Sequence, residues 1–347
     1  MTLNFDRLYV VVATLFIILG VGFFCRKVKI IDDVASKKLS KLILMIGQPA
    51  MLVGSLATAE YSEENLQTAL IMLVLGFVFH AFLAVIAFVF ALPIKNKINL
   101  DEQKLSEFGL MFTNCAFIGF PIFEALLPGK GQFMASFLCI SFNILIWTWG
   151  LVIIGRGRKD IKLTIRKALV NFGTIPCAVG FAFFLLKNPS VGFELPEFLT
   201  QALQYLTNLC TPISVLITGA LIATQSPKKI FLNWKIYYFN LVKLVVFPII
   251  VCLITKILLL ILPFEGLEIY ATFVTAAAAL PTASSVTMMA ENYGLDSGYS
   301  SLTVGTTSIL AVLTIPLTMM LTQWIFSIDV QAIATNVMNM ITQNLIP

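Results

Sequence analysis

The sequence predicts an all-helical, polytopic membrane protein whose ten transmembrane helices form two inverted repeats of five. Three observations lead to this prediction. The 347 residues are 59% hydrophobic and only 12% charged, whereas a soluble domain usually carries about 25% charged residues. Ten apolar stretches approach the roughly 20 residues that a spanning helix needs. The fourth stretch of each half is interrupted near its middle by proline and small polar residues.

The expected spans follow from the apolar stretches. In chain order they cover residues 8–25, 39–58, 69–92, 108–127, 132–155, 171–187, 198–224, 236–262, 268–291 and 299–326. The first span is expected to remain as a transmembrane helix, because Arg26, Lys27 and Lys29 follow it. A cleavable signal peptide carries its positive charge before the apolar run.

The distribution of basic residues predicts the orientation. Eighteen of the 23 lysines and arginines fall in or beside the connections after the first, third, fifth and seventh spans. Cytoplasmic loops carry such an excess, so these connections are expected in the cytoplasm and both termini outside the cell membrane. Residues 160–170 alternate basic and apolar side chains, which is typical of a segment along the membrane surface.

The longest cytoplasmic connection divides the chain into two halves. We expect a first repeat at 1–155, a linker at 156–170, a second repeat at 171–327 and an external tail at 328–347. An odd number of spans in each half forces the second half to enter the membrane from the opposite side. Pro49 and Pro212, each in the second span of its half and followed by small residues, add faint similarity between the halves.

The interruption of the fourth span covers residues 114–121. Pro121 has no N–H and frees a carbonyl one turn earlier, Gly119 permits non-helical backbone, and Asn114 carries both a donor and an acceptor. A packed proline kink is the alternative interpretation. At bilayer depth a break is tolerated only inside protein or along a watery cavity, and the half-helix N-terminus that it exposes attracts anions.

The ninth span carries matching parts at 279–285. Paired broken helices in repeated halves are the best sequence indication of a transporter's binding site. We therefore expect the substrate's anionic group between the two breaks, contacted by Asn114 and by backbone donors near Pro281. The candidate substrate-contacting residues are Asn114, Cys115, Gly119, Pro121, Asn143, Leu280, Pro281, Thr282, Ser284 and Thr307.

Few ionisable groups lie within the spans. His80 and Glu124 are candidates for proton coupling, because either group titrates near neutral pH in a suitable environment. The alternatives are a neutral histidine bonded to a carbonyl and a glutamate in the outer interface. Lys243 and Lys256, near opposite ends of the eighth span, are expected to reach the headgroups. The six cysteines show no C-x-x-C spacing and are expected to pack as small apolar residues; no metal or cofactor is indicated.

Several motifs occur in a specific order along almost the whole chain. They are Asn114-x-x-x-x-Gly119-x-Pro121, then Ala279-Leu280-Pro281 followed by Ala290-Glu291-Asn292-Tyr293-Gly294, then Thr307-Ser308 with Thr314-Ile315-Pro316. Through these motifs, and through Pro49-Ala50, the chain resembles the auxin efflux carrier family within the bile acid–sodium symporter superfamily.

The resemblance implies that the fourth and ninth spans cross at their broken centres. It implies a scaffold of spans 1, 2, 6 and 7, a moving core of the other six (an elevator mechanism), and homodimers through the scaffold. Asn114 matches a substrate-contacting asparagine of the family, His80 and Glu124 match a support site on spans 3 to 5, and Thr282 or Ser284 would supply a second polar group. Ala311 stands where a serine is common, and the long cytoplasmic loop of the plant carriers is absent.

The favoured function is secondary active transport of a small organic anion, such as an auxin-like or dicarboxylate substrate, by alternating access. The coupling ion, a proton or sodium, is left open. One alternative is a monovalent cation/proton exchanger, which usually needs aspartates at the crossing; no aspartate falls within an expected span. Another is a membrane sensor, which would be expected to carry a signalling domain. An enzyme is disfavoured, since the sequence holds no H-E-x-x-H, G-x-S-x-G or phosphate-binding Gly-Lys motif.

Overall fold

The computed structural model describes residues 4–94, 97–158, 166, 170–226, 232–262 and 266–328. Throughout these residues the regular elements are helices, and one isolated bridge joins Thr113 to Thr282. The expected surface segment at 160–170 and the tail at 328–347 fall almost entirely outside the described residues.

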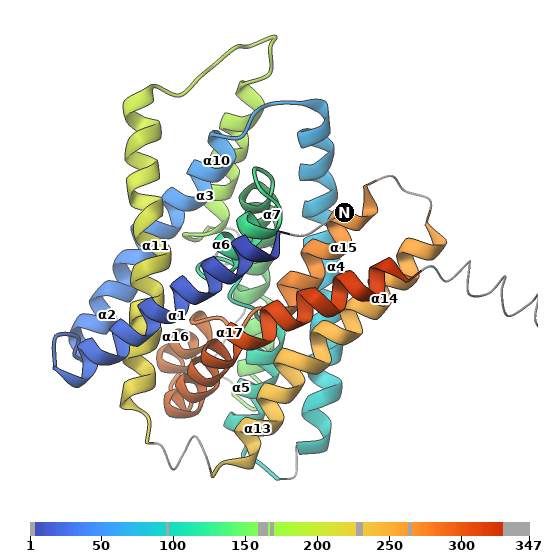
Figure 1. The fold of residues 1–347 in the computed structure, drawn as a ribbon. Coiled ribbons are helices and arrows are strands. Elements are labelled where there is room, and N and C mark those ends of the chain that lie inside the picture. The colour runs from blue at the N-terminus through green and yellow to red at the C-terminus, as the bar shows by residue number, and fades with distance from the viewer. Residues whose placement is uncertain are drawn as a thin grey trace, which may run out of the picture.

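Figure 1 shows the helices in chain order. The first half contains α1 (Phe5–Lys27), α2 (Asp33–Leu42), α3 (Gln48–Ala57), α4 (Glu63–Ala91), α5 (Leu100–Met111), α6 (Gly119–Leu126), α7 (Gly131–Trp147) and α8 (Trp149–Ile154). The second half contains α10 (Thr174–Leu186), α11 (Glu197–Thr224), α13 (Trp234–Leu241), α14 (Phe247–Ile261), α15 (Leu267–Ala279), α16 (Ser285–Asn292) and α17 (Ser297–Ser327).

Seven helical stretches in the described chain are long and apolar enough to cross a membrane. They cover Phe5–Lys27, Asp33–Ala57, Glu63–Ile94, Gly131–Ile154, Glu197–Thr224, Trp234–Ile261 and Ser297–Ser327. The helices α10 and α15 are apolar but shorter. The all-helical, multi-pass character expected from the sequence is therefore confirmed.

Capping residues, rather than hydropathy, decide where the helices begin. The helix α5 starts at Leu100, well before the apolar stretch that was expected from residue 108. The side chain of Asn99 accepts from the backbone N–H of Glu102, whose own carboxylate accepts from the Asn99 N–H. This capping box satisfies two donors that a helix start leaves unpaired. Ser62 caps α4 in the same manner through Asn65.

Prolines interrupt some expected spans and leave others continuous. A π-helical turn at Ile43–Gly47 precedes Pro49, and another at Val242–Val246 precedes Pro248. Such wide turns accommodate a missing hydrogen bond without ending the helix. The long helix α11 contains Pro212 and continues through it. The expected single helices of the second and eighth spans are thus divided locally by π-helical turns. That of the fifth span is divided at Thr148, between α7 and α8, where there is no proline.

Two groups of helices pack side by side in the fold. The helices α1, α3, α10 and α11 pack against one another, while α4, α5 and α7 form a second group with α14, α15 and α17. The backbones of α1 and α11 touch, because a Cβ on Gly22 would lie 2.1 Å from the Leu216 carbonyl oxygen and one on Gly219 would lie 2.0 Å from that of Leu19. Only glycine permits this approach.

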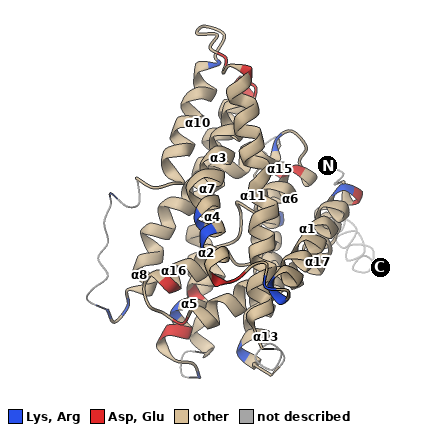
Figure 2. Cartoon of the chain, turned by 90° about the vertical axis from the view of Figure 1, so that its left-hand side faces the viewer, with Lys and Arg blue, Asp and Glu red and all other residues tan. Residues whose placement is uncertain are grey.

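Several helix ends lie together in Figure 1. The connections α3–α4 and α10–α11 lie at the upper end, and the last turns of α4 and α11 and the start of α13 lie at the lower end. Figure 2 shows that most of the helical ribbon is uncharged, with charged residues at the upper tip, beside α2 and around the lower end. A low content of charged residues within the helices is typical of a protein that lies across a bilayer.

Candidate functional site

Two interrupted helices meet in the interior of the bundle. One interruption, residues 112–118, separates α5 from α6; the other, residues 280–284, separates α15 from α16. We call these two segments together the crossover. The backbone N–H of Asn114 donates to the Pro281 carbonyl at 2.8 Å, and the N–H of Ala283 donates to the Phe112 carbonyl at 3.0 Å. Each break therefore satisfies backbone groups of the other, which apolar surroundings demand.

Threonines fasten the crossover to its neighbours. The N–H of Thr282 donates to Thr307 Oγ1 of α17 at 3.2 Å, and Thr282 Oγ1 donates to the Gly109 carbonyl of α5 at 3.2 Å. Both threonines are fully buried. They hold the two breaks in one arrangement, and the backbone N–H groups of Thr282 and Ala283 are already occupied.

Pro121 does not free a carbonyl within a helix, as was expected from the sequence, because it lies in the first turn of α6. It is the third residue of α6, where a helix has no intrahelical partner for the N–H in any case. The carbonyl one turn earlier, that of Phe117, accepts a hydrogen bond from Thr211 Oγ1 of α11 at 2.9 Å. Gly119 opens α6 against the Phe123 ring, since a Cβ there would lie 2.8 Å from a ring carbon.

Asn114 connects the two interruptions through its side chain. Its Oδ1 accepts from the N–H of Phe117 at 3.3 Å, and its Nδ2 lies 3.5 Å from Ser284 Oγ. The residue is only 3% exposed. Both contacts are long for hydrogen bonds, so the amide is available to a better-placed partner at the crossover.

Three hydroxyl groups at or near the crossover are buried without a partner among the described residues. They belong to Thr113, Ser285 and Thr287. Thr113 lies in the first break, Ser285 is the first residue of α16, and Thr287 follows within its first turn. A buried hydroxyl without a partner is costly, so these three hydroxyls are candidate contacts for a bound molecule. The candidate set from the sequence missed all three, although they adjoin its motifs.

The structure adds Lys243 to the groups near the crossover. This corrects the expectation that Lys243 reaches the lipid headgroups. Its side chain is fully buried and does not reach the headgroups. The Nζ atom donates to the Leu110 carbonyl at 2.7 Å and lies 5.8 Å from the centre of the Phe247 ring. Leu110 belongs to the last turn of α5, whose carbonyl end carries partial negative charge. Among the described residues no carboxylate forms an ion pair with Lys243.

The proposed coupling residues lie in different surroundings. His80 is fully buried; its Nδ1 lies 2.8 Å from the Gly76 carbonyl oxygen and 3.1 Å from Ser141 Oγ, and its Nε2 has no partner among the described residues. Its ring packs 6.2 Å, centre to centre, from that of Phe112 in the first break. His80 therefore lies beside the crossover.

Glu124 lies in α6 and orders the connection to α7. Its Oε1 accepts from the N–H of Gly129 at 2.8 Å, and its Oε2 accepts from the N–H of Gln132 at 3.4 Å. These contacts place its carboxylate at the end of α6 away from the break.

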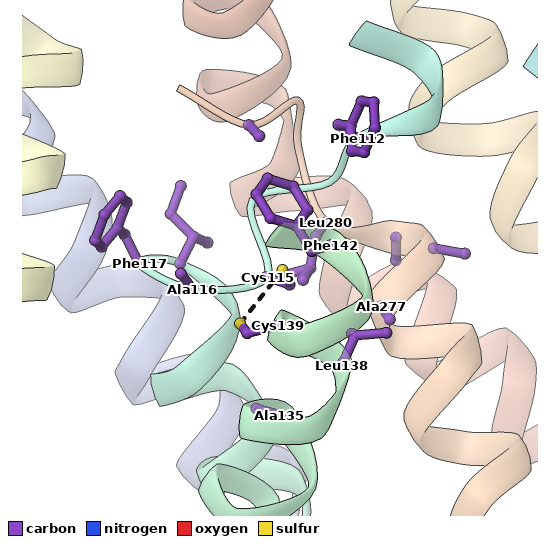
Figure 3. Close-up of a cluster of buried hydrophobic side chains, with 14 of the residues drawn as sticks. Phe112, Cys115, Ala116, Phe117, Ala135, Leu138, Cys139, Phe142, Ala277 and Leu280 are labelled. Atoms are coloured by element: carbon purple, nitrogen blue, oxygen red, sulfur yellow. Dashed lines mark hydrogen bonds between the residues drawn. The ribbon is translucent and has the colours of Figure 1, made fainter. Parts of the chain in front are cut away.

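Two further candidates contact α7. Figure 3 shows Cys115 in the first break facing Cys139, with their sulfur atoms 3.6 Å apart as free thiols, and Leu280 nearby from the second break. Asn143 donates to the Cys139 carbonyl at 2.7 Å and packs against Gly173 before α10, where a Cβ would lie 1.9 Å from the amide carbon. Asn143 thus faces α10 and not the second break.

An apolar cleft adjoins the crossover. It is a small space of about 20 Å³ between α1, α6, α11 and α17, part of it open to the surface. Its wall includes Leu15, Ile118, Val215, Ser308 and Ala311. Ile118 is the last residue of the first break, so the cleft begins where the polar groups of the crossover end.

Comparison with known proteins identifies the family. The sequence model of the membrane transport protein family matches residues 8–171 and again residues 158–319. The chain belongs to this family. This family is the auxin efflux carrier family, which the sequence motifs resemble. An uncharacterized transporter of Methanocaldococcus jannaschii is 23% identical over 226 residues, which cover 63% of this chain and 70% of the relative. The protein is therefore a multi-pass membrane transporter.

Proposed function

We propose that the protein is a secondary active transporter that moves a small organic anion across the cell membrane by alternating access. One observation carries this proposal: unpartnered buried hydroxyls and a buried ammonium lie at a crossing of two broken helices. Buried donors and cations of this kind are costly without a negatively charged partner. A carboxylate supplies that partner.

The anion's place follows from the groups that remain available. The helices α6 and α16 both begin at the crossover, and helix N-termini carry partial positive charge. The backbone N–H groups of Thr282 and Ala283 are engaged, and so are those of Gly119, Phe120 and Val286 at the starts of these helices. We therefore assign the direct contacts to the Asn114 amide and to the free hydroxyls of Thr113 and Ser285. Lys243 supplies a countercharge from behind α5.

Ten spans result when the divided helices are joined. The second, fourth, fifth, eighth and ninth spans then comprise α2 with α3, α5 with α6, α7 with α8, α13 with α14, and α15 with α16. The fourth and ninth spans occupy equivalent places in two halves of five. This pairing supports two inverted repeats, with basic connections in the cytoplasm and both termini outside.

The helix groups fit a scaffold and a moving core. Within the described residues few polar contacts join α1, α3, α10 and α11 to the remainder; those near the crossover are Thr211 with Phe117 and Ser55 with Ser136. Rigid-body motion between two packed groups is favoured when few hydrogen bonds must be exchanged. The scaffold is also the proposed surface for a homodimer.

The test is uptake by the purified protein in liposomes. We expect a radiolabelled small carboxylate to accumulate, and Thr113→Val with Asn114→Ala to abolish uptake while the protein remains folded. Leu313→Ala on the exposed face of α17 serves as the matched control. If the protein in liposomes exchanges monovalent cations for protons and transports no carboxylate, the cation/proton exchanger is favoured instead.

A further inference from the structure

Two free thiols face each other beside the crossover. Cys115 lies in the first break and Cys139 lies in α7, and both side chains are fully buried. Their sulfur atoms are 3.6 Å apart (Figure 3). The anion contacts proposed above use neither sulfur atom. The pair is therefore a chemically reactive group that the binding of an anion leaves without a role.

A third buried thiol that also contacts α7 has a different partner. Cys177 of α10 donates to the Ser136 carbonyl, with a sulfur–oxygen distance of 3.7 Å. Ser136 lies one turn before Cys139 in the same helix. Replacement of Cys177 therefore removes a thiol beside α7 and leaves the contact between Cys115 and Cys139 in place, which makes it a matched control.

A cation lies near the pair. The Lys243 ammonium is close enough to Cys115 to interact with it electrostatically, and the Leu110 carbonyl holds it at 2.7 Å. Thiol–disulfide exchange passes through a negatively charged sulfur, and a lysine beside a cysteine favours that charge. The two sulfur atoms and the ammonium together provide the groups that exchange with a small disulfide needs.

We propose that Cys115 and Cys139 form a modification site for small organic disulfides, and that the bond formed between them closes the crossover to its substrate. This inference rests on the proposed function, because alternating access brings water and a small reagent to these buried sulfur atoms. Cytosolic thiols keep cysteines reduced. The dithiol is therefore the working form of the carrier, and the disulfide is its inactive form.

The exchange occurs in two steps. The Cys115 sulfur attacks one sulfur of the reagent, whose S–S bond breaks; one reagent thiol leaves, and Cys115 carries a mixed disulfide. The Cys139 sulfur then attacks the Cys115 sulfur and displaces the second reagent thiol. The cysteine pair loses two electrons and two protons, and the reagent gains both as two thiols.

The new bond moves the first break. It requires the two sulfur atoms to approach from 3.6 Å to about 2.0 Å. Cys139 belongs to a helix of 17 residues, whereas Cys115 lies in the non-helical segment directly after Asn114, so most of the movement falls on the break. Binding groups must keep their positions to within about 0.5 Å. The movement is larger than that, and it displaces the Asn114 amide relative to the second break.

The experiment treats the full-length protein in liposomes with dithiodipyridine, a small aromatic disulfide. Mass spectrometry of the digested protein should find the peptides of Cys115 and Cys139 joined, with two hydrogen atoms lost. Uptake of a radiolabelled carboxylate, indole-3-acetate or butanedioate, should fall with the joined fraction, at least about tenfold when joining is complete, and return after dithiothreitol. Cys177→Ser should behave as the parent does.

Cys139→Ala tests the order of the two steps. Without the second sulfur, Cys115 should retain the reagent as a stable mixed disulfide, which the mass of its peptide reports. Cys139→Ser replaces this variant if the alanine protein does not fold, and the measurement on the parent protein depends on neither.

The possible results distinguish the thiol site from the proposed function. If neither cysteine reacts, if both retain the reagent without joining, or if joining requires Cys177, the pair is not the modification site. If the two cysteines join and uptake is unchanged, the bond does not close the crossover and the inference is overturned. If the untreated liposomes accumulate no carboxylate, the proposed function fails, and the masses still decide whether the dithiol reacts.

Discussion

Replacement of Lys243 by methionine separates a role in anion binding from a role in folding. Methionine keeps much of the volume and removes the ammonium. The change deletes a hydrogen bond of 2.7 Å to the Leu110 carbonyl and a cation above the Phe247 ring. It also removes a fully buried charge.

The two effects on stability oppose each other. A hydrogen bond from a charged donor contributes about 1.5–3 kcal/mol, while burial of an ammonium costs several kcal/mol. We therefore expect the free energy of unfolding of Lys243→Met to stay within about 2 kcal/mol of the parent value or to rise.

Lys243→Met is expected only to weaken anion binding. The crossover begins at Phe112, two residues after Leu110, so an anion there lies roughly 6–10 Å from Nζ at about 3.5 Å per residue. At an effective dielectric constant of about 20, the attraction is about 2 kcal/mol. Loss of that attraction weakens carboxylate binding by roughly 30-fold.

The assay pairs calorimetric titration of the carboxylate with thermal unfolding followed by tryptophan fluorescence. Lys256→Met is the matched control, because the Lys256 ammonium binds the carbonyls of Phe326 and Ile328 at the end of α17. On the same span it lies about 20 Å further along, at 1.5 Å per residue. A Lys243→Met protein that binds the anion with unchanged affinity and unfolds more easily would reduce Lys243 to a cap for α5 and refute the reasoning.

Three further predictions concern the site, the orientation and the coupling. Asn114→Ala should weaken carboxylate binding by about 1–3 kcal/mol, the cost of an unmatched buried polar partner, in a protein that still folds; unchanged affinity by titration contradicts the site. A cysteine introduced at position 159 should react with a membrane-impermeant thiol reagent only after the cells are opened. Labelling in intact cells would contradict the predicted orientation and, with it, the predicted inverted repeat. Transport should respond to a proton gradient imposed across the membrane, and His80→Ala with Glu124→Gln should remove that response while binding persists; an unaltered response means that neither residue carries the coupled proton.

The sequence alone determined the class of the protein and the location of its unusual backbone. Hydropathy is a local property, and a bilayer requires apolar length whatever the tertiary contacts. The two interruptions could be located because proline and glycine alter the backbone at their own positions. Pro121 lies in the first turn of α6, directly after the first interruption.

The tertiary structure decided which groups meet and which remain free. Thr282 looked available in the sequence, yet its hydroxyl and its N–H are both occupied by partners far along the chain. Thr113 and Ser285 lie at the breaks in the sequence but were not among the expected contact residues, and their buried hydroxyls have no partner among the described residues.

Lys243 shows most directly why the tertiary structure was needed. A lysine near the end of a span normally extends its charge to water, and a local pattern contains nothing against that outcome. Its burial follows from the π-helical turn at Val242–Val246 and from the end of α5, which is more than a hundred residues earlier in the chain. Hydrophobic and conformational preferences act on each residue alone, whereas hydrogen-bond partners and countercharges exist only after distant segments have packed.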